Sequence, residues 1–414
     1  MTKLQISINY SQSMISVEEA LRIVLENQLP DQIIEVPLLE ANGKVLAENI
    51  FADRDFPPFN RVAMDGIAIN MSFLSVISEG DKLLIENIQF AGEPQKTMSG
   101  NGNCMEVMTG AILPENTDTV IRYEDLDFTE IEGRKYAIVN IPLSEPGQNV
   151  HHQGIDKSAQ SLLIQQGTKI SPAEIAIMAT VGKDYCKVKA APAVAVISTG
   201  DELVDIHENP ENHQIRRSNS YMLAAALSES GIKARLYHLN DDPEKLENRL
   251  RIILAANDVL ILSGGVSAGK KDFVPQIMEN LGVKKLFHKV SQKPGKPFWF
   301  GKSEYGKIVF ALPGNPGSTF LCFYKYVKPF FSGLKQETLK KAVLSDKIFF
   351  RQELTLFVPV TTRCNEEAAL IATPLKNSGS GDLAVLLSCD GFLELPASEA
   401  IFEEGKSFSY INFK

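Results

Sequence analysis

The chain has 414 residues, of which 44% are hydrophobic and 22% are charged, so it can form about two to four domains with ordinary cores. Its formal net charge of −9 provides no basic excess to neutralise a phosphate backbone, which argues against a nucleic-acid-binding protein. We find neither a charged-then-apolar signal pattern nor an apolar run long enough to cross a bilayer, so no secretion signal and no membrane span is predicted.

Cysteine and histidine usage narrows the chemistry further. The 5 cysteines are odd in number and form no C-x-x-C pair, which argues against a disulfide framework and favours the reducing cytoplasm. The 6 histidines show no metal-ligand spacing, so no zinc site is predicted. Any metal is expected to be a hard, oxygen-liganded ion such as Mg²⁺.

The first part of the chain combines helical and strand-like patterns. Ser16 and Glu19 form a capping-box pattern that predicts a helix to about Gln28. Residues 33–146 are rich in strand signals, with alternation in 82–90 and 136–141, and predict a β-rich domain. Ser171 and Pro172 then begin a helix ending near Gly182. We expect this helical piece to pack with the first helix, so that residues 51–146 form an insertion in a discontinuous N-terminal domain of residues 1–50 and 147–186.

From residue 187 to about 331, strands and helices alternate, which predicts one doubly wound α/β domain. Three continuous apolar runs have the composition of parallel strands covered on both faces: Val194–Ile197, Val259–Leu262 and Ile308–Leu312. Between them we expect a helix capped by Asn219 or Ser220, a strand at Lys233–His238 and a helix starting at Asp242-Pro243. Alternation in Glu353–Val360 and a turn at Asn377–Gly381 predict a small C-terminal β domain over residues 332–414.

Each of the three apolar runs ends in a tight turn of small and polar residues. Ligands of open α/β sheets bind along the carboxyl edge of the strands, so we expect these turns to converge on one crevice. Gly264 and Gly265 allow a sharp turn and a close approach to a phosphate, and the turn is expected to open a helix. Residues 264–271 also read G-x-x-x-x-G-K-K, but Lys271 replaces the Ser or Thr that a triphosphatase loop needs for Mg²⁺. A glycine-rich connection without a ligand is the simpler alternative.

Six motifs together resemble the molybdopterin molybdenumtransferases, and the resemblance spans essentially the whole chain. They are FNRVAMDGIA at 59–68, MTGAILP at 108–114, STGDEL at 198–203, SGGVSAGKKD at 263–272, KPGKP at 293–297 and LPGNPGS at 312–318.

This resemblance implies a specific reaction and assembly. Enzymes of the family insert molybdenum from molybdate into adenylylated molybdopterin and release AMP, with Mg²⁺ as cofactor. They are homodimers of four-domain subunits, with a molybdopterin-binding α/β domain and a β-barrel-like C-terminal domain. The cleft lies between the α/β and C-terminal domains of one subunit and the inserted domain of the other. A molybdopterin adenylyltransferase would be a further partner.

The resemblance also assigns roles to the oxyanion-binding residues. Lys293 and Lys296 flank a Pro-Gly pair, so their ammonium groups can be aimed at one oxyanion. The substrate-binding and molybdate-binding residues implied are Lys293, Lys296, Arg351, Ser380, Gly264, Gly265 and Ser267. Lys289 is expected on the same strand as the two lysines and joins them in the implied catalytic set. A solvated lysine-rich hairpin is the alternative.

Carboxylates fill the complementary roles. Glu202, Asp241 and Asp272 follow predicted strands, and acidic groups beside a phosphate need a cation between them, so they are assigned to Mg²⁺. Asp272 could instead cap a helix, and Asp241 could be a neighbour of the cap Asp242. The resemblance further implies catalytic roles for Asp65, Thr109 and Asp156.

The chain departs from the family pattern at four positions. Val62 and Ile67 replace a serine and a tyrosine beside Asp65, and the stretch 149–156 lacks the usual arginine near His151 and the usual glutamate near Ile155. Two other classes stay open: a nucleotide-binding hydrolase or kinase, which ATP turnover without molybdate would reveal, and a non-catalytic scaffold. The absence of a long linker or low-complexity arm argues against the scaffold.

Overall fold

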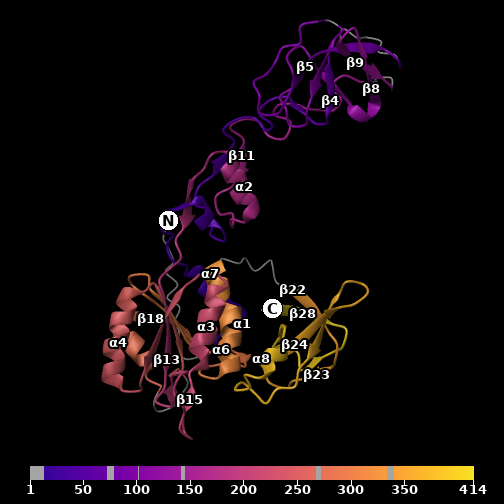
Figure 1. The fold of residues 1–414 in the computed structure, drawn as a ribbon. Helices are drawn as coiled ribbons and strands as arrows, with labels where there is room; N and C mark the ends of the chain where they lie inside the picture. Colours follow the sequence, from indigo (N-terminus) through magenta and orange to yellow (C-terminus); the bar gives the residue numbers. More distant parts are fainter. Residues whose placement is uncertain (1–13, 72–78, 101, 141–144, 267–271, 333–339) are drawn as a thin grey trace, which may run out of the picture. The chain divides into compact units, whose positions relative to one another are not determined.

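The computed structural model describes residues 14–71, 79–100, 102–140, 145–266, 272–332 and 340–414 (Figure 1). The chain divides into two compact units. One is Ile33–Lys189, and the other joins Ala190–Lys414 to the N-terminal segment that ends at Gln32.

A mixed six-stranded sheet dominates the first unit. Its order is β7-β4-β6-β5-β9-β8, and it confirms the predicted β-rich region. Ile67 and Ile121 pack with Val139 in one core cluster, whereas Ala68 and Val107 belong to another, so alternate residues are buried in two clusters. The elements are β4 (Gly66–Ile69), β5 (Lys82–Gln89), β6 (Cys104–Val107), β7 (Thr119–Arg122), η2 (Tyr123–Asp125), β8 (Leu126–Ile131) and β9 (Arg134–Val139).

Paired short strands join the segments that precede and follow this sheet. β1 (Ile33–Pro37) pairs with β12 (Tyr185–Lys189), β2 (Ile50–Phe51) with β11 (Leu162–Ile164), and β3 (Arg61–Val62) with β10 (Val150–His151). The η1 turn (Leu38–Ala41) and α2 (Pro172–Thr180) lie beside β1 and β12. The predicted start of α2 is confirmed, because Ser171 and Glu174 form a complete capping box.

The packing predicted for the first helix is wrong. α1 (Val17–Glu26) is capped by Ser16 as expected, but it packs on the α/β domain rather than with α2. Its stripe of Val17, Leu21 and Val24 lies in the same core cluster as Phe298 and Tyr326. An amphipathic pattern shows that a helix buries one face, but it does not identify the partner.

The α/β domain is built on a six-stranded sheet in the order β16-β13-β17-β21-β20-β18. The first four strands are parallel, and β20 and β18 extend the sheet with antiparallel pairing. α1, α3, α6 and α7 cover one face, and α4 and α5 cover the other (Figure 1). The strands are β13 (Val194–Thr199), β14 (Leu203–Val204), β15 (Ile215–Arg216), β16 (Ala234–Leu239), β17 (Val259–Ser263), β18 (Val283–His288), β20 (Trp299–Ser303) and β21 (Ile308–Leu312). The helices are α3 (Ser218–Ser228), α4 (Pro243–Ala256), α5 (Val274–Asn280), α6 (Pro316–Cys322), the π-helical turn η3 (Phe323–Val327) and α7 (Lys328–Ser332).

This domain confirms most of the predicted elements and corrects two details. Asp242 caps α4 as expected, but Arg217, not Asn219 or Ser220, stands at the cap position of α3. The helix expected to open from the glycine turn after β17 would begin in residues 267–271, which lie outside the described ranges, and the next described helix is α5, which starts at Val274 after the cap Phe273. The structure therefore also excludes Asp272 as the cap of α5.

The C-terminal domain is a closed five-stranded barrel, which confirms the predicted β-barrel-like fold. The order β24-β25-β22-β28-β26 closes because β24 also pairs with β26. β19 (Gln292–Lys293), from the lysine motif, adds to β24 in parallel. The remaining elements are β22 (Lys340–Leu344), β23 (Ile348–Phe349), β24 (Thr355–Cys364), β25 (Leu370–Pro374), α8 (Val385–Ser388), β26 (Gly391–Leu395), β27 (Ile401–Phe402) and β28 (Ser407–Asn412).

The structure also shows the state of the cysteines and whether any described helix could cross a membrane. All the cysteines carry free thiols, and Cys364 alone among them is exposed. Among the described residues, no helix combines the length and the apolar character needed to span a membrane.

Candidate functional site

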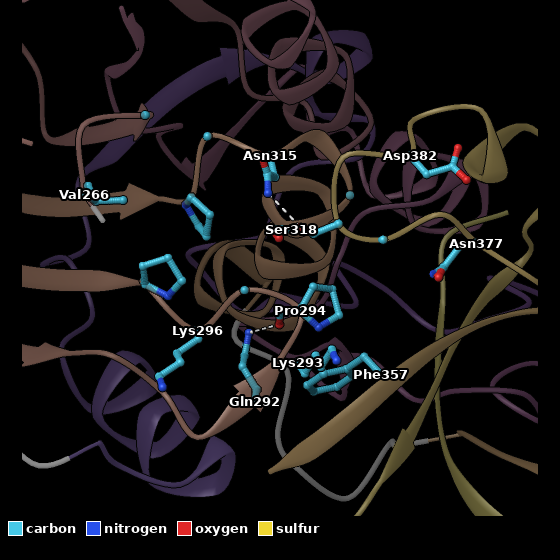
Figure 2. Close-up of a pocket in the computed structure, with 18 of the residues that line it drawn as sticks. Val266, Gln292, Lys293, Pro294, Lys296, Asn315, Ser318, Phe357, Asn377 and Asp382 are labelled. Carbon is cyan, nitrogen blue, oxygen red and sulfur yellow. Dashed lines mark hydrogen bonds between the residues drawn. The ribbon is translucent and has the colours of Figure 1, made fainter. Parts of the chain in front are cut away.

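A cavity of about 760 Å³ lies between the α/β sheet and the barrel (Figure 2). Its size is typical of small-molecule sites. It collects the turns after β13, β17 and β21, as the crevice hypothesis predicted, and it also includes the lysine loop before β20 and the barrel segment around residue 380. The predicted site residues that line it are Glu202, Asp241, Gly264, Gly265, Asp272, Lys293, Lys296 and Ser380.

The glycine turn after β17 is packed too closely for any side chain. Gly264 and Gly265 both have positive φ, +100° and +68°. A Cβ added at Gly264 would lie 2.8 Å from the Thr199 carbonyl oxygen, and one added at Gly265 would lie 2.9 Å from a methyl of Val274. The backbone of this turn can therefore approach a ligand directly. Predicted ligand Ser267 and the loop lysine Lys271 lie outside the described residues.

Two lysines supply positive charge to the cavity. Lys293 and Lys296 are exposed on the loop that follows β18, and Figure 2 shows them on the same segment as Pro294. The Lys293 ammonium lies 5.6 Å from the centre of the Phe350 ring. Within the described ranges, neither lysine forms an ion pair with a carboxylate, so both charges are available to an anion.

Three carboxylates of the α/β domain line the same cavity. Glu202 folds back over the end of β13, because a Cβ added at Gly200 would lie 2.6 Å from its Oε1. Asp241 and Asp272 come from the turns before α4 and α5. In the part of the chain that the structure describes, no three acidic, histidine or cysteine side chains form a ready metal cluster. This donor set fits Mg²⁺, which usually takes one or two carboxylates and completes its shell with water and substrate phosphate.

The barrel closes the cavity through Ser380. Its Oγ accepts a hydrogen bond of 2.7 Å from Asn315 Nδ2, and its carbonyl accepts one of 3.0 Å from the Gly317 N–H at the start of α6. A Cβ on Gly317 would lie 3.0 Å from that carbonyl, so the glycine permits this contact. Asn377 and Asp382 lie on the same barrel segment, across the view from Lys296 in Figure 2.

Asp65 and Thr109 form a pair in the other unit. Asp65 Oδ1 accepts hydrogen bonds from the Thr109 backbone N–H at 2.6 Å and from its Oγ1 at 2.8 Å. These two bonds, the backbone one first, hold the pKa of Asp65 below its ordinary value. Asp65 is therefore an ionised carboxylate at neutral pH, held by the turn that carries Thr109.

A second cluster in that unit contains Asp156. The Nε2 of His151 lies 3.3 Å from Asp156 Oδ1, and its Nδ1 lies 3.1 Å from the Arg61 guanidinium. Since arginine only donates, we infer that Nδ1 accepts and that the ring proton is on Nε2, facing the carboxylate. Arg61, from the FNRVAMDGIA motif, thus supplies a cation beside His151.

Lys289 and Arg351 are not among the residues that line the cavity. The expectation that Lys289 shares a strand with Lys293 is wrong, because β18 ends at His288 and Lys289 turns the chain with φ +74°. Sequence reasoning missed Gln292 and Thr199, which both line the cavity. Thr199 lies inside the STGDEL motif and Gln292 directly precedes the KPGKP motif, so their positions in the sequence could have indicated them. They were missed because neither residue carries a charge.

Family models match the chain along most of its length. They are described as the MoeA N-terminal region (domain I and II) over residues 15–182, a probable molybdopterin binding domain over 195–333, and the MoeA C-terminal region (domain IV) over 341–413. A molybdopterin molybdenumtransferase of Synechocystis is 38% identical over 96% of this chain and 99% of its own length. The chain belongs to the MoeA family of molybdopterin molybdenumtransferases. The resemblance drawn from the motifs is confirmed.

Other MoeA relatives agree across the full chain. The Bacillus subtilis molybdopterin molybdenumtransferase is 30% identical over 95% of this chain and 93% of its own. A crystal structure of a molybdopterin biosynthesis MoeA protein from Pyrococcus horikosii has a TM-score of 0.81 and 31% identity, covering 97% of this chain and all of the other. This MoeA chain is thus a transferase of molybdenum cofactor biosynthesis with the fold of its family.

Proposed function

We propose that this protein inserts molybdenum from molybdate into adenylylated molybdopterin and releases AMP in a Mg²⁺-dependent reaction. One observation carries the proposal: a single cavity brings two lysines, a glycine turn and three carboxylates of the α/β domain together. The lysines suit a doubly charged oxyanion, and the glycine turn suits the phosphates of the adenylylated pterin. Molybdate is a substrate here, so its site need only hold the ion until transfer.

We assign the Mg²⁺ ion to Glu202, Asp241 and Asp272. Bound Mg²⁺ would neutralise charge on the phosphates as the phosphoanhydride to AMP is cleaved. One or two of these side chains would ligate the ion directly and the rest of the set would act through its water shell, on the side of the cavity formed by β13, β16 and β17. Lys293 and Lys296 would hold the oxyanion from the barrel side, where β19 carries the first of them.

We further propose a homodimer in which Asp65, Thr109 and Asp156 act on the cleft of the partner subunit. Asp65 is exposed and ionised, which suits a group that meets a ligand held elsewhere. A molybdopterin adenylyltransferase would supply the substrate. The free thiols support action in the reducing cytoplasm.

The experiment is a molybdate titration by calorimetry of the wild type and of Lys296→Ala. If Lys296 donates a charged hydrogen bond, its loss should weaken binding by about 1.5–3 kcal/mol, or roughly ten- to a hundredfold. Lys284→Ala, an exposed lysine of β18 away from the cavity, is the matched control and should bind as the wild type does. Equal affinity in folded Lys296→Ala and wild type would remove this lysine from the site. ATP turnover without molybdate would favour the hydrolase instead.

A further inference from the structure

Gln292, the residue before the two-lysine motif, is a buried polar side chain. It is 1% exposed, and its amide contacts three groups. Its Nε2 donates to the Pro294 carbonyl at 3.1 Å, drawn as a dashed line in Figure 2, and to Cys322 Sγ at 3.5 Å. Its Oε1 accepts a hydrogen bond from the Tyr326 hydroxyl.

The loop backbone rests directly on this group. Gly295 has φ +92°, and a Cβ there would lie 2.5 Å from Gln292 Nε2 and 2.8 Å from Cys322 Sγ. Burial raises the pKa of the Cys322 thiol to about 12, so it stays protonated and can donate to the Gly295 carbonyl, 3.9 Å away. The turn between the two lysines is therefore held on its inner side by two buried side chains.

Tyr326 connects this group to the helical face of the domain. It is fully buried in the π-helical turn η3, and burial raises its pKa well above the ordinary value, so its hydroxyl is a donor. That fixes the orientation of the Gln292 amide, with Nε2 toward Pro294. The adjacent Lys325 forms a 2.6 Å ion pair with Glu394 of β26 in the barrel. One helical turn thus contacts both the lysine loop and the barrel.

We propose that Tyr326 and Gln292 are positioning residues that fix the Pro294–Gly295 backbone so that Lys293 and Lys296 address one oxyanion. The claim that the two lysines bind an oxyanion rests on the proposed function. The claim that Tyr326 and Gln292 hold the loop backbone does not, because it describes the protein without a ligand.

The first experiment therefore uses no ligand. Hydrogen exchange over residues 289–298 is compared in the wild type and Tyr326→Phe, which removes only the hydroxyl. The Val290 N–H bonds to the Lys296 carbonyl at 3.0 Å across the loop, so its exchange should quicken by about two- to tenfold when one hydrogen bond is lost. Tyr324→Phe is the matched control, because its hydroxyl contacts Glu229 at 3.5 Å instead. Wild-type exchange in Tyr326→Phe overturns the proposal.

A second variant separates positioning from packing. Gln292→Met with Tyr326→Phe replaces both partners by apolar groups, which should return the unfolding midpoint close to that of the wild type. The fluorescence of Trp299, the single tryptophan, reports folding beside the loop. Amide exchange in the loop should remain faster than in the wild type, because the Pro294 carbonyl has lost its donor. For the same reason molybdate should bind about two- to tenfold more weakly than it does to the wild type.

The outcomes are distinct. If loop protection and affinity both recover with stability in the double variant, the pair has a packing role only, and the proposal fails. If loop exchange quickens but the wild type itself does not bind molybdate, the positioning of the loop stands and the proposed function fails.

Discussion

Gly295→Ala should damage the lysine loop through two separable effects. The first is conformational, because φ at this position is +92° and an L-residue in the left-handed region costs about 1–2 kcal/mol. The second is steric, because the new methyl would lie 2.5 Å from Gln292 Nε2 and 2.8 Å from Cys322 Sγ. Overpacking of this kind costs about 1–3 kcal/mol. We expect the free energy of unfolding to fall by about 2–5 kcal/mol in total.

Gly306→Ala is the matched control. Gly306 has a similar φ of +79°, but no atom lies within 4 Å of its added Cβ. Only the conformational cost of about 1–2 kcal/mol should appear there. Urea unfolding followed by Trp299 fluorescence measures both variants, and Cys322→Ala combined with Gly295→Ala should recover part of the steric cost. Equal destabilisation by the two alanines would refute the close packing of Gln292 and Cys322 against the loop.

Three further predictions concern the proposed Mg²⁺ site, the hydrogen-bonded pair of Asp65 and Thr109, and the proposed homodimer. Asp272→Asn removes a charge with little change in volume, so half-maximal molybdenum insertion should need more Mg²⁺; an unchanged Mg²⁺ dependence would take Asp272 out of the metal site. Thr109→Val removes one of two hydrogen bonds that lower the pKa of Asp65, so this pKa should rise toward its ordinary value in a carboxyl NMR titration. A lowered carboxyl pKa stabilises the folded protein at pH values above the pKa of the unfolded state, and this stabilisation is lost as the pH falls through the pKa of the folded state. The variant should therefore lose this stabilisation at a higher pH than the wild type does. A titration identical to that of the wild type would contradict the Thr109–Asp65 contact. Mixing inactive Asp65→Ala and Asp272→Ala subunits should restore some activity through one intact cleft, whereas failure despite proven subunit exchange would place the site within one chain.

The convergence of the strand turns could be predicted from the sequence because it depends on short-range signals. Apolar runs such as Val259–Leu262 identify buried parallel strands, and parallel strands put their carboxyl ends on one edge. Gly264 was found in this way, whereas Lys296 was assigned from its Pro-Gly motif and the family resemblance, and both line the cavity.

The errors arose where distant partners decide the structure. Lys289 adopts φ +74° without being a glycine, and no local pattern predicts that turn. The strand partner of Gln292 is Thr355, far along the chain, so the sequence around the lysines could not show which sheet they join. In the same way, the apolar stripe of the first helix predicted that the helix buries one face. It did not predict that this face lies in the core cluster that contains Tyr326.

The lysine loop is shared between two domains, because β18 and β20 at its ends belong to the α/β sheet while β19 within it belongs to the barrel. The Thr355 N–H donates to the Ser291 carbonyl at 3.0 Å, and in the β19–β24 pairing Gln292 lies opposite Thr355 and Lys293 opposite Leu356. A rotation of the barrel relative to the α/β sheet would therefore move the loop and change the distance between the ammonium groups of Lys293 and Lys296. If the two lysines hold molybdate as proposed, the strength of that binding depends on the spacing of the two domains, so a substitution deep in the barrel should change how long the ion stays bound.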